Sequence, residues 1–140
     1  MSSPADRDER NPHMHPVQYF LPSYEEASVL AQCTDPAEIA QALKTVCPGV
    51  VVVKHEADGC YVNDGAQAFH VPAFRVHAID TTGAGDNFVG GFLCAVLQGL
   101  SLPACVQYAC ATGAISVQSI GTTTGLQSRQ QVEDFLRAQV

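Results

Sequence analysis

The sequence predicts an α/β domain, in which buried strands alternate with helices. Residues 49–54 read GVVVVK, and four consecutive valines without polar alternation indicate a strand that is covered on both faces. Directly before this run, residues 35–47 combine a helix cap at Asp35, a proline at the first helical position and a capping-box acid at Glu38. A capped helix that leads into a buried strand is typical of α/β proteins.

Two elements are expected ahead of that helix. Residues 17–21, VQYFL, form a β-branched and aromatic run that Pro22 closes, which predicts a short strand. Residues 23–32, SYEEASVLAQ, predict a short helix. The helix at 35–47 should bury one apolar stripe. The residues of this stripe are Ile39, Leu43 and Val46.

A β-hairpin is predicted after the valine strand. Residues 60–74 contain Asn63-Asp64-Gly65, a strong turn signal between two short strands. Residues 74–79, FRVHAI, predict a further strand. The sheet is expected to be mostly parallel, with the strands at 50–53 and 75–79 as buried neighbours.

The second half of the chain is expected to be largely helical. Every helical turn of residues 87–100 contains apolar residues. This helix is therefore predicted to pack on the sheet and to be buried almost all round. Two more helices are predicted at 102–118 and 129–139, with Ser101 and Ser128 as their caps.

Composition limits the classes of partner. The 140 residues, 46% of them hydrophobic, fit one globular domain, which we assign to residues 17–140 behind a disordered tail at 1–16. The net charge is −7 and the seven Lys and Arg residues are scattered, which argues against nucleic acid as a partner. Because no apolar run approaches the ~18 residues of a membrane span, we expect no membrane partner and a cytoplasmic location.

The six cysteines include no C-x-x-C pair. Several of them lie in apolar, helix-like runs. We therefore expect reduced, buried packing residues rather than disulfides or metal ligands.

Residues 80–86, DTTGAGD, place glycines where a strand should end and a buried helix begin. The unpaired N–H groups and the partial positive charge of a helix start bind anions, and glycine lets a ligand approach the main chain closely. This pattern indicates a phosphate site held mainly by backbone, with Asp86 as a base for an attacking hydroxyl. The alternative is that Asp86 is only a first-turn acid and the glycines only a tight turn.

The stretch 80–92, DTTGAGDNFVGGF, resembles the second signature of the ribokinase-like (PfkB-type) carbohydrate kinases. The resemblance implies a three-layer α/β/α fold, of which this chain carries the C-terminal part: a mostly parallel sheet with flanking helices and a β-hairpin. It also implies that Asp86 is the catalytic base that takes the proton from the acceptor hydroxyl. The residues implied for the anion hole are Gly83, Ala84 and Gly85, and those implied to brace the loop are Asp80 and Thr81.

Two further regions resemble the nucleotide-binding parts of that family. Residues 50–62 resemble a strand-loop-strand unit and imply that Lys54 and Gly59 approach the nucleotide. Glu56 stands where the family usually has glycine, so its carboxylate either faces solvent or lowers nucleotide affinity. Residues 109–126 resemble the helix and loop that enclose adenine, although small residues in a helix are also packing devices. The implied adenine contacts are Ala111, Gly113 and Ala114.

Residues 20–27, FLPSYEEA, resemble the N-x-x-E segment with which the family orders magnesium and phosphate through water. Glu26 matches the acid of that segment, and Ser23 replaces its asparagine with a hydroxyl of shorter reach. The alternative is that Glu25 and Glu26 are first-turn acids favoured by the helix dipole.

The resemblance covers residues 17–140 and implies ATP-dependent phosphorylation of a sugar or related alcohol, with ATP and Mg²⁺ as cofactors. It reaches only the C-terminal half of the family, whose N-terminal half carries most sugar contacts, so transfer by this chain is expected to be impaired. One alternative is a truncated product or remnant that binds nucleotide without turnover. Another is a module that pairs through an exposed sheet edge, for example as a homodimer.

Overall fold

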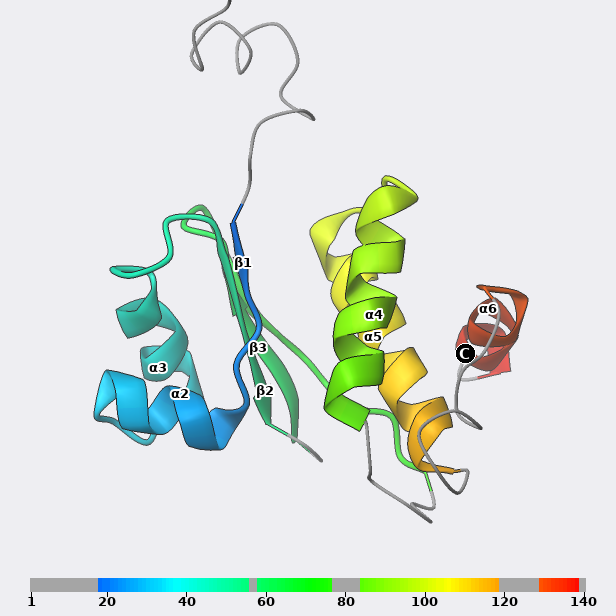
Figure 1. Ribbon diagram of the computed structural model, residues 1–140, viewed down its shortest axis with the longest axis horizontal. Helices are drawn as coiled ribbons and strands as arrows, with labels where there is room; N and C mark the ends of the chain where they lie inside the picture. Colours follow the sequence, from blue (N-terminus) through cyan, green and yellow to red (C-terminus); the bar gives the residue numbers. More distant parts are fainter. Residues whose placement is uncertain (1–17, 56–57, 77–83, 119–128, 139–140) are drawn as a thin grey trace, which may run out of the picture.

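The computed structural model describes residues 18–55, 58–76, 84–118 and 129–138 (Figure 1). The predicted tail at 1–16 therefore lies outside the described residues. In chain order the elements are β1 (Tyr19–Phe20), α2 (Tyr24–Ala31), α3 (Pro36–Leu43), β2 (Val50–His55), β3 (Gly59–Asn63), β4 (Ala68–Val71), α4 (Ala84–Leu97), α5 (Leu102–Val117) and α6 (Arg129–Ala138).

The described strands form one mixed sheet in the order β1-β2-β3-β4. β1 runs parallel to β2, with Tyr19 opposite Val50, whereas β2, β3 and β4 follow one another antiparallel. The prediction that residues 75–79 lie beside β2 is wrong, because β1 and β3 occupy both of its edges. Residues 72–76 belong to no strand, and 77–79 lie outside the described residues.

β2 is buried on both faces, as its valine run predicts. Val50 and Val52 point into a core shared with α4, α5 and α6, whereas Val51 and Val53 point into a core shared with α2 and α3. Figure 1 shows α2 and α3 on one side of the sheet and α4, α5 and α6 on the other. Each fully buried valine contributes on the order of 1.5–3 kcal/mol relative to an exposed one. The three-layer α/β/α arrangement follows from this strand.

The helices of the first layer begin at well-formed caps. The Asp35 carboxylate accepts from the Glu38 backbone N–H at 3.0 Å, and Pro36 occupies the first turn of α3, as predicted. Ile39 and Leu43 are buried. The prediction for the third stripe residue is wrong, since Val46 follows the end of α3 and is 69% exposed.

The predicted hairpin is formed by β3 and β4. Gly65 adopts a φ of 92°, a left-handed conformation that favours glycine. The Asp64 carboxylate accepts from the backbone N–H groups of Ala66 and Gln67, at 2.9 and 2.7 Å. These local hydrogen bonds fix the turn and hence the register of the two strands.

α4 is buried on one side rather than all round. Phe88, Phe92 and Ala95 face the core, whereas Leu93 and Leu97 are 47% and 89% exposed. Because the sheet and α5 cover only one face of this helix in the described part of the chain, the apolar residues on its other face meet solvent. The sequence prediction of burial all round is therefore wrong for this face.

The cysteine prediction holds for most of the six residues. All are free thiols, and four of them are buried. The exceptions are Cys33, which is half-buried, and Cys94, which is exposed on the open face of α4.

α4 and α5 approach each other closely at a single glycine. A Cβ atom added to Gly91 would lie 2.4 Å from the Thr112 Oγ1 atom and 2.8 Å from its Cβ atom. The same atom added to the preceding residue, Gly90, would meet nothing within 4 Å. Gly91 is therefore a packing position and Gly90 is an exposed helix position.

These two glycines form a matched pair for a stability test. Gly91→Ala should lower the free energy of unfolding by about 1–3 kcal/mol, because the added methyl group overpacks the contact with Thr112. Gly90→Ala should raise it by about 0.5–1 kcal/mol through helix propensity. Urea unfolding followed by circular dichroism measures both. Equal effects of the two substitutions would contradict the close packing of α4 on α5.

Candidate functional site

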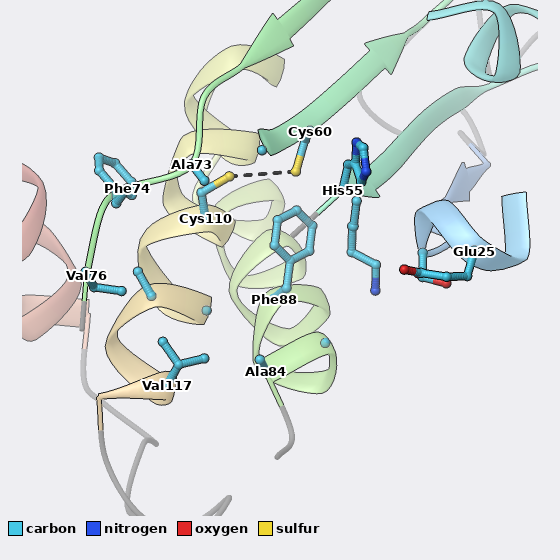
Figure 2. A pocket seen from close by; sticks show the side chains of 16 residues that line it. Glu25, His55, Cys60, Ala73, Phe74, Val76, Ala84, Phe88, Cys110 and Val117 are labelled. Atoms are coloured by element: carbon cyan, nitrogen blue, oxygen red, sulfur yellow. Dashed lines mark hydrogen bonds between the residues drawn. The ribbon is translucent and has the colours of Figure 1, made fainter. Parts of the chain in front are cut away.

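An open pocket of about 620 Å³ lies where β2 and β3 meet the start of α4 and the second half of α5 (Figure 2). Of the residues predicted from the sequence, it brings together Lys54, Gly59, Ala84, Gly85, Gly113 and Ala114. These residues come from four different elements. The structure therefore assembles most of the predicted nucleotide-binding positions into one wall.

Lys54 provides a positive charge at the start of α4. Its Nζ atom lies 3.6 Å from the position that a Cβ atom on Gly85 would take, and 5.7 Å from the ring centroid of Phe88. The backbone holds this residue in place, since its N–H donates to the Pro22 carbonyl at 2.9 Å. The ammonium group thus faces the first turn of α4 over an aromatic ring, a favourable cation–π arrangement.

The start of α4 adds backbone donors to this charge. α4 is 14 residues long, and the first N–H groups of any helix lack intrahelical acceptors and carry a partial positive charge. Ala84 and Gly85, at this start, line the pocket, and the Lys54 ammonium group lies beside Gly85. Together they make a local environment suited to an anion.

Asp86 lies in the first turn of α4 and is exposed. It follows the two pocket-lining residues directly but is not itself part of the pocket wall. A carboxyl group that can accept a proton therefore lies next to the anion environment.

Gly59 is required by packing at the turn between β2 and β3. Its φ is 91°, and a Cβ atom there would lie 2.1 Å from the Val71 carbonyl oxygen. No other residue type fits this approach without moving the backbone. Gly59 therefore lets the strand ends close against residues 71–73.

Two of the three positions on α5 predicted to contact adenine lie in the pocket wall. Gly113 and Ala114 line the pocket, and a Cβ atom on Gly113 would lie 3.8 Å from the Ala84 carbonyl oxygen. Ala111 is fully buried in the core shared with the sheet and does not line the pocket.

Glu26 is held by a helix cap. Its Oε1 atom accepts from the Ser23 hydroxyl at 2.9 Å and from the Ser23 backbone N–H at 3.3 Å, and the Ser23 hydroxyl accepts from the Glu26 N–H. These two hydrogen bonds to Ser23, with a smaller contribution from Lys54, lower the pKa of Glu26. Glu25, not Glu26, lines the pocket (Figure 2).

Sequence reasoning missed several residues of the pocket wall, namely Glu25, His55, Cys60, Phe88 and Cys110. Periodicity offered a signal for two of them, because Phe88 follows Gly85 by three positions and Cys110 precedes Gly113 by three, on the same helix faces. The His55 ring stacks on Tyr24 at 4.1 Å, and its Nδ1 atom lies 3.2 Å from an Asp58 carboxylate oxygen. No local pattern predicts these contacts.

Several predicted positions lie outside the described residues: Gly83 of the anion hole, the bracing residues Asp80 and Thr81, the loop residue Glu56, and 119–126 of the adenine loop. Within the described ranges, no three His, Cys, Asp or Glu side chains group together in a way that could hold a metal ion.

No helix in the described part of the chain is long and apolar enough to cross a membrane. The cytoplasmic location stays a prediction.

Comparison with known proteins finds similarity to carbohydrate kinases. Residues 6–129 match the family described as pfkB family carbohydrate kinase. The chain is 34% identical over 124 residues to 2-dehydro-3-deoxygluconokinase of Bacillus subtilis, an alignment that covers 88% of this chain and 38% of that protein.

Solved structures agree with this match. Ribokinase from Thermotoga maritima has a TM-score of 0.77 and 30% identity, over 85% of this chain and 42% of that one. A putative ribokinase II from E. coli, in complex with ATP and Mg²⁺, has a TM-score of 0.79 and 27% identity, over 96% of this chain and 44% of that one. The chain therefore spans about two fifths of the length of these relatives.

The Ser23–Glu26 cap gives a test by titration. Ser23→Ala should raise the pKa of Glu26 toward its ordinary value of 4.5, because the substitution removes the strongest hydrogen bond to the carboxylate. It should also lower stability by about 1 kcal/mol through loss of the N-cap. Carbon-detected NMR of the glutamate carboxyl groups measures the pKa, with Ser28→Ala in the same helix as the control.

The effect of Ser23→Ala on stability should depend on pH. A carboxyl group whose pKa is lowered on folding stabilises the protein above its unfolded pKa, and that stability is lost as the pH falls through the folded value. The stability difference between the wild type and Ser23→Ala should therefore narrow below pH 4.5. An unchanged pKa of Glu26 in Ser23→Ala would contradict the cap.

Proposed function

The chain belongs to the pfkB family of carbohydrate kinases, and we propose that it binds ATP in the pocket at the start of α4 and acts in phosphoryl transfer to a hydroxyl of a sugar or related alcohol. One observation carries the proposal: the Lys54 ammonium group faces Gly85 at the first turn of a 14-residue helix, inside an open pocket. A cation beside free helix N–H groups is an arrangement that favours a phosphate group.

The nucleotide would lie along the pocket, with its phosphates toward Lys54 and the start of α4. Gly83, Ala84 and Gly85 would form the anion hole that receives the transferring group, with Asp80 and Thr81 bracing the loop. Gly113 and Ala114 on α5 would supply a smooth surface for the adenine, and Gly59 would keep the strand turn close to it. A structure of a putative ribokinase II from E. coli in complex with ATP and Mg²⁺ is similar over 96% of this chain, which supports ATP as the ligand.

Asp86 would act as the general base. The acceptor hydroxyl oxygen attacks the γ-phosphorus of ATP, its proton passes to the Asp86 carboxylate, and the bond between the γ-phosphorus and the β,γ-bridging oxygen breaks to release ADP. The exposed place of Asp86, directly after Ala84 and Gly85, supports this role, since an acceptor can reach it from solvent. Lys54 and the helix start would stabilise charge on the phosphoryl oxygens.

We propose that Mg²⁺ arrives at this site with the nucleotide. The described residues offer no group of three metal ligands, whereas Glu25 lines the pocket as a single carboxylate and Glu26 is engaged with Ser23. Mg²⁺ at kinase sites is commonly held by one or two carboxylates, water and phosphate oxygens. When bound, it would neutralise phosphate charge, and Glu25 or Glu26 would contact it through water.

The chain spans about two fifths of the length of these relatives. We propose that it binds the nucleotide and provides the base, and we assign no described residue to the acceptor sugar. The alternative function is nucleotide binding without phosphoryl transfer.

A role in pairing has one observation in its favour. β1 is one of the two edge strands of the described sheet, and its Tyr19 is 36% exposed. An open strand edge is a template for pairing with another chain, and a homodimer along β1 would cover it.

Removal of the Lys54 charge should lower the affinity of the chain for ATP. Lys54→Met keeps the length of the side chain but removes its charge, and should weaken binding of ATP about 10- to 100-fold, since a charge-assisted hydrogen bond contributes about 1.5–3 kcal/mol. Arg137→Gln, which removes a positive charge from the distant helix α6, should leave the affinity unchanged. Isothermal titration calorimetry with ATP and Mg²⁺ measures both variants. Equal affinities in Lys54→Met and the wild type would contradict the phosphate site.

If Asp86 is the base, its replacement should change the rate of phosphoryl transfer without weakening ATP binding. Asp86→Asn should lower phosphoryl transfer by about 10²–10⁴-fold and leave ATP affinity equal or higher, because a negative charge near the phosphates is removed. Asp134→Asn on α6 is the matched control. Transfer from radiolabelled ATP would be measured for the chain alone and for the chain joined to the N-terminal part of the Bacillus subtilis relative, with ribose, fructose and 2-dehydro-3-deoxygluconate as acceptors.

Two outcomes count against the proposal in different ways. A rate in Asp86→Asn within about tenfold of the parent would exclude Asp86 as the base. If the fused protein binds ATP but transfers phosphate to none of the acceptors, the result would favour the nucleotide-binding alternative.

A further inference from the structure

Two thiols meet in the wall of the pocket. The Sγ atoms of Cys60 on β3 and Cys110 on α5 lie 3.7 Å apart, although the residues are separated by 50 positions in the sequence. The side chains are buried, at 3% and 9% exposure, yet both residues line the open pocket (Figure 2). A small reagent that enters the pocket therefore reaches a pair of adjacent thiols.

We propose that Cys60 and Cys110 form an oxidation site, at which a peroxide converts the two thiols into an intramolecular disulfide. A disulfide has an S–S length of about 2.05 Å, so the two sulfur atoms need to approach by roughly 1.7 Å. The bond would join the sheet to the helical layer formed by α4 and α5.

The chemistry balances with one peroxide for each pair of thiols. The sulfur of one cysteine attacks a peroxide oxygen, the O–O bond breaks, and a sulfenic acid and one water form. The sulfur of the second cysteine then attacks the sulfenic sulfur, the S–O bond breaks, and a second water leaves as the S–S bond forms. Two thiols are oxidised, and both oxygen atoms of hydrogen peroxide are reduced to water.

The surroundings keep the pair reduced under mild conditions. The hydrogen bond with Cys110 and burial hold the pKa of the Cys60 thiol well above its ordinary range, while Lys54 lowers it to a smaller extent. Because the thiolate is the reactive form, a high pKa slows the first attack on peroxide. The site should therefore respond to sustained rather than brief exposure to oxidant.

The experiment uses the full chain with Cys94→Ser, which removes the exposed thiol and with it disulfides between molecules through that residue. The folded protein is treated with excess hydrogen peroxide, its remaining thiols are alkylated, and the digest is examined by mass spectrometry. We expect the loss of two thiols and a peptide pair that links Cys60 to Cys110. The oxidised protein should melt about 5–10 °C above the same sample after reduction, since the bond closes a long loop.

Three variants test the assignment. Cys60→Ser and Cys110→Ala should each abolish the cross-link and the thermal shift. Cys105→Ser removes another buried thiol from the same helix and should leave both unchanged. Circular dichroism before oxidation establishes that each variant is folded.

The proposal is overturned if Cys60 and Cys110 remain free thiols, if they are converted to sulfinic acids without a cross-link, or if they form disulfides with other cysteines. None of these measurements uses nucleotide binding or phosphoryl transfer. A negative result for the oxidation site therefore does not contradict the kinase function, and a negative result for the kinase function does not contradict the oxidation site.

Discussion

Burial of β2 on both faces determines how the helices are arranged around the sheet. Alternate valines of this strand enter two separate cores, so α2 and α3 must cover one face of the sheet and α4 and α5 the other. The strand continues from these valines into Lys54, whose ammonium group reaches the start of α4. The packing that forms the three layers thus also places the positive charge of the site.

Close approaches of backbone complete the pocket. Gly59 allows the end of β3 to pack against residues 71–73, and Gly91 allows α4 to lie against Thr112 of α5. With α4 held in this way, Ala84 lies next to Gly113, and Gly85 lies next to Lys54. The site is therefore a product of tertiary packing, in which each wall comes from an element that also belongs to the core.

The sequence predicts the local features of this fold well, because each has a local physical cause: the valine run, the Asp35 cap and the turn at Gly65. Features that depend on distant segments are not predicted. The neighbours of β2, the exposed face of α4 at Leu97, and the contact between Cys60 and Cys110 are set by pairing across the fold. In the site, the letters S-x-x-E at residues 23–26 are compatible with both a capping box and a magnesium-ordering segment, and local sequence alone does not separate them.

In the proposed function, the phosphates of ATP bind at the start of α4, beside Lys54. This can be tested by two-dimensional ¹H–¹⁵N NMR of the labelled chain, with titrations of ATP and Mg²⁺, of tripolyphosphate and of adenosine. We expect saturable shifts of the Ala84 and Gly85 amide signals with ATP and with tripolyphosphate, and much smaller shifts of these signals with adenosine. Shifts confined to other regions such as α6, or equal shifts of these amides with adenosine, would contradict it.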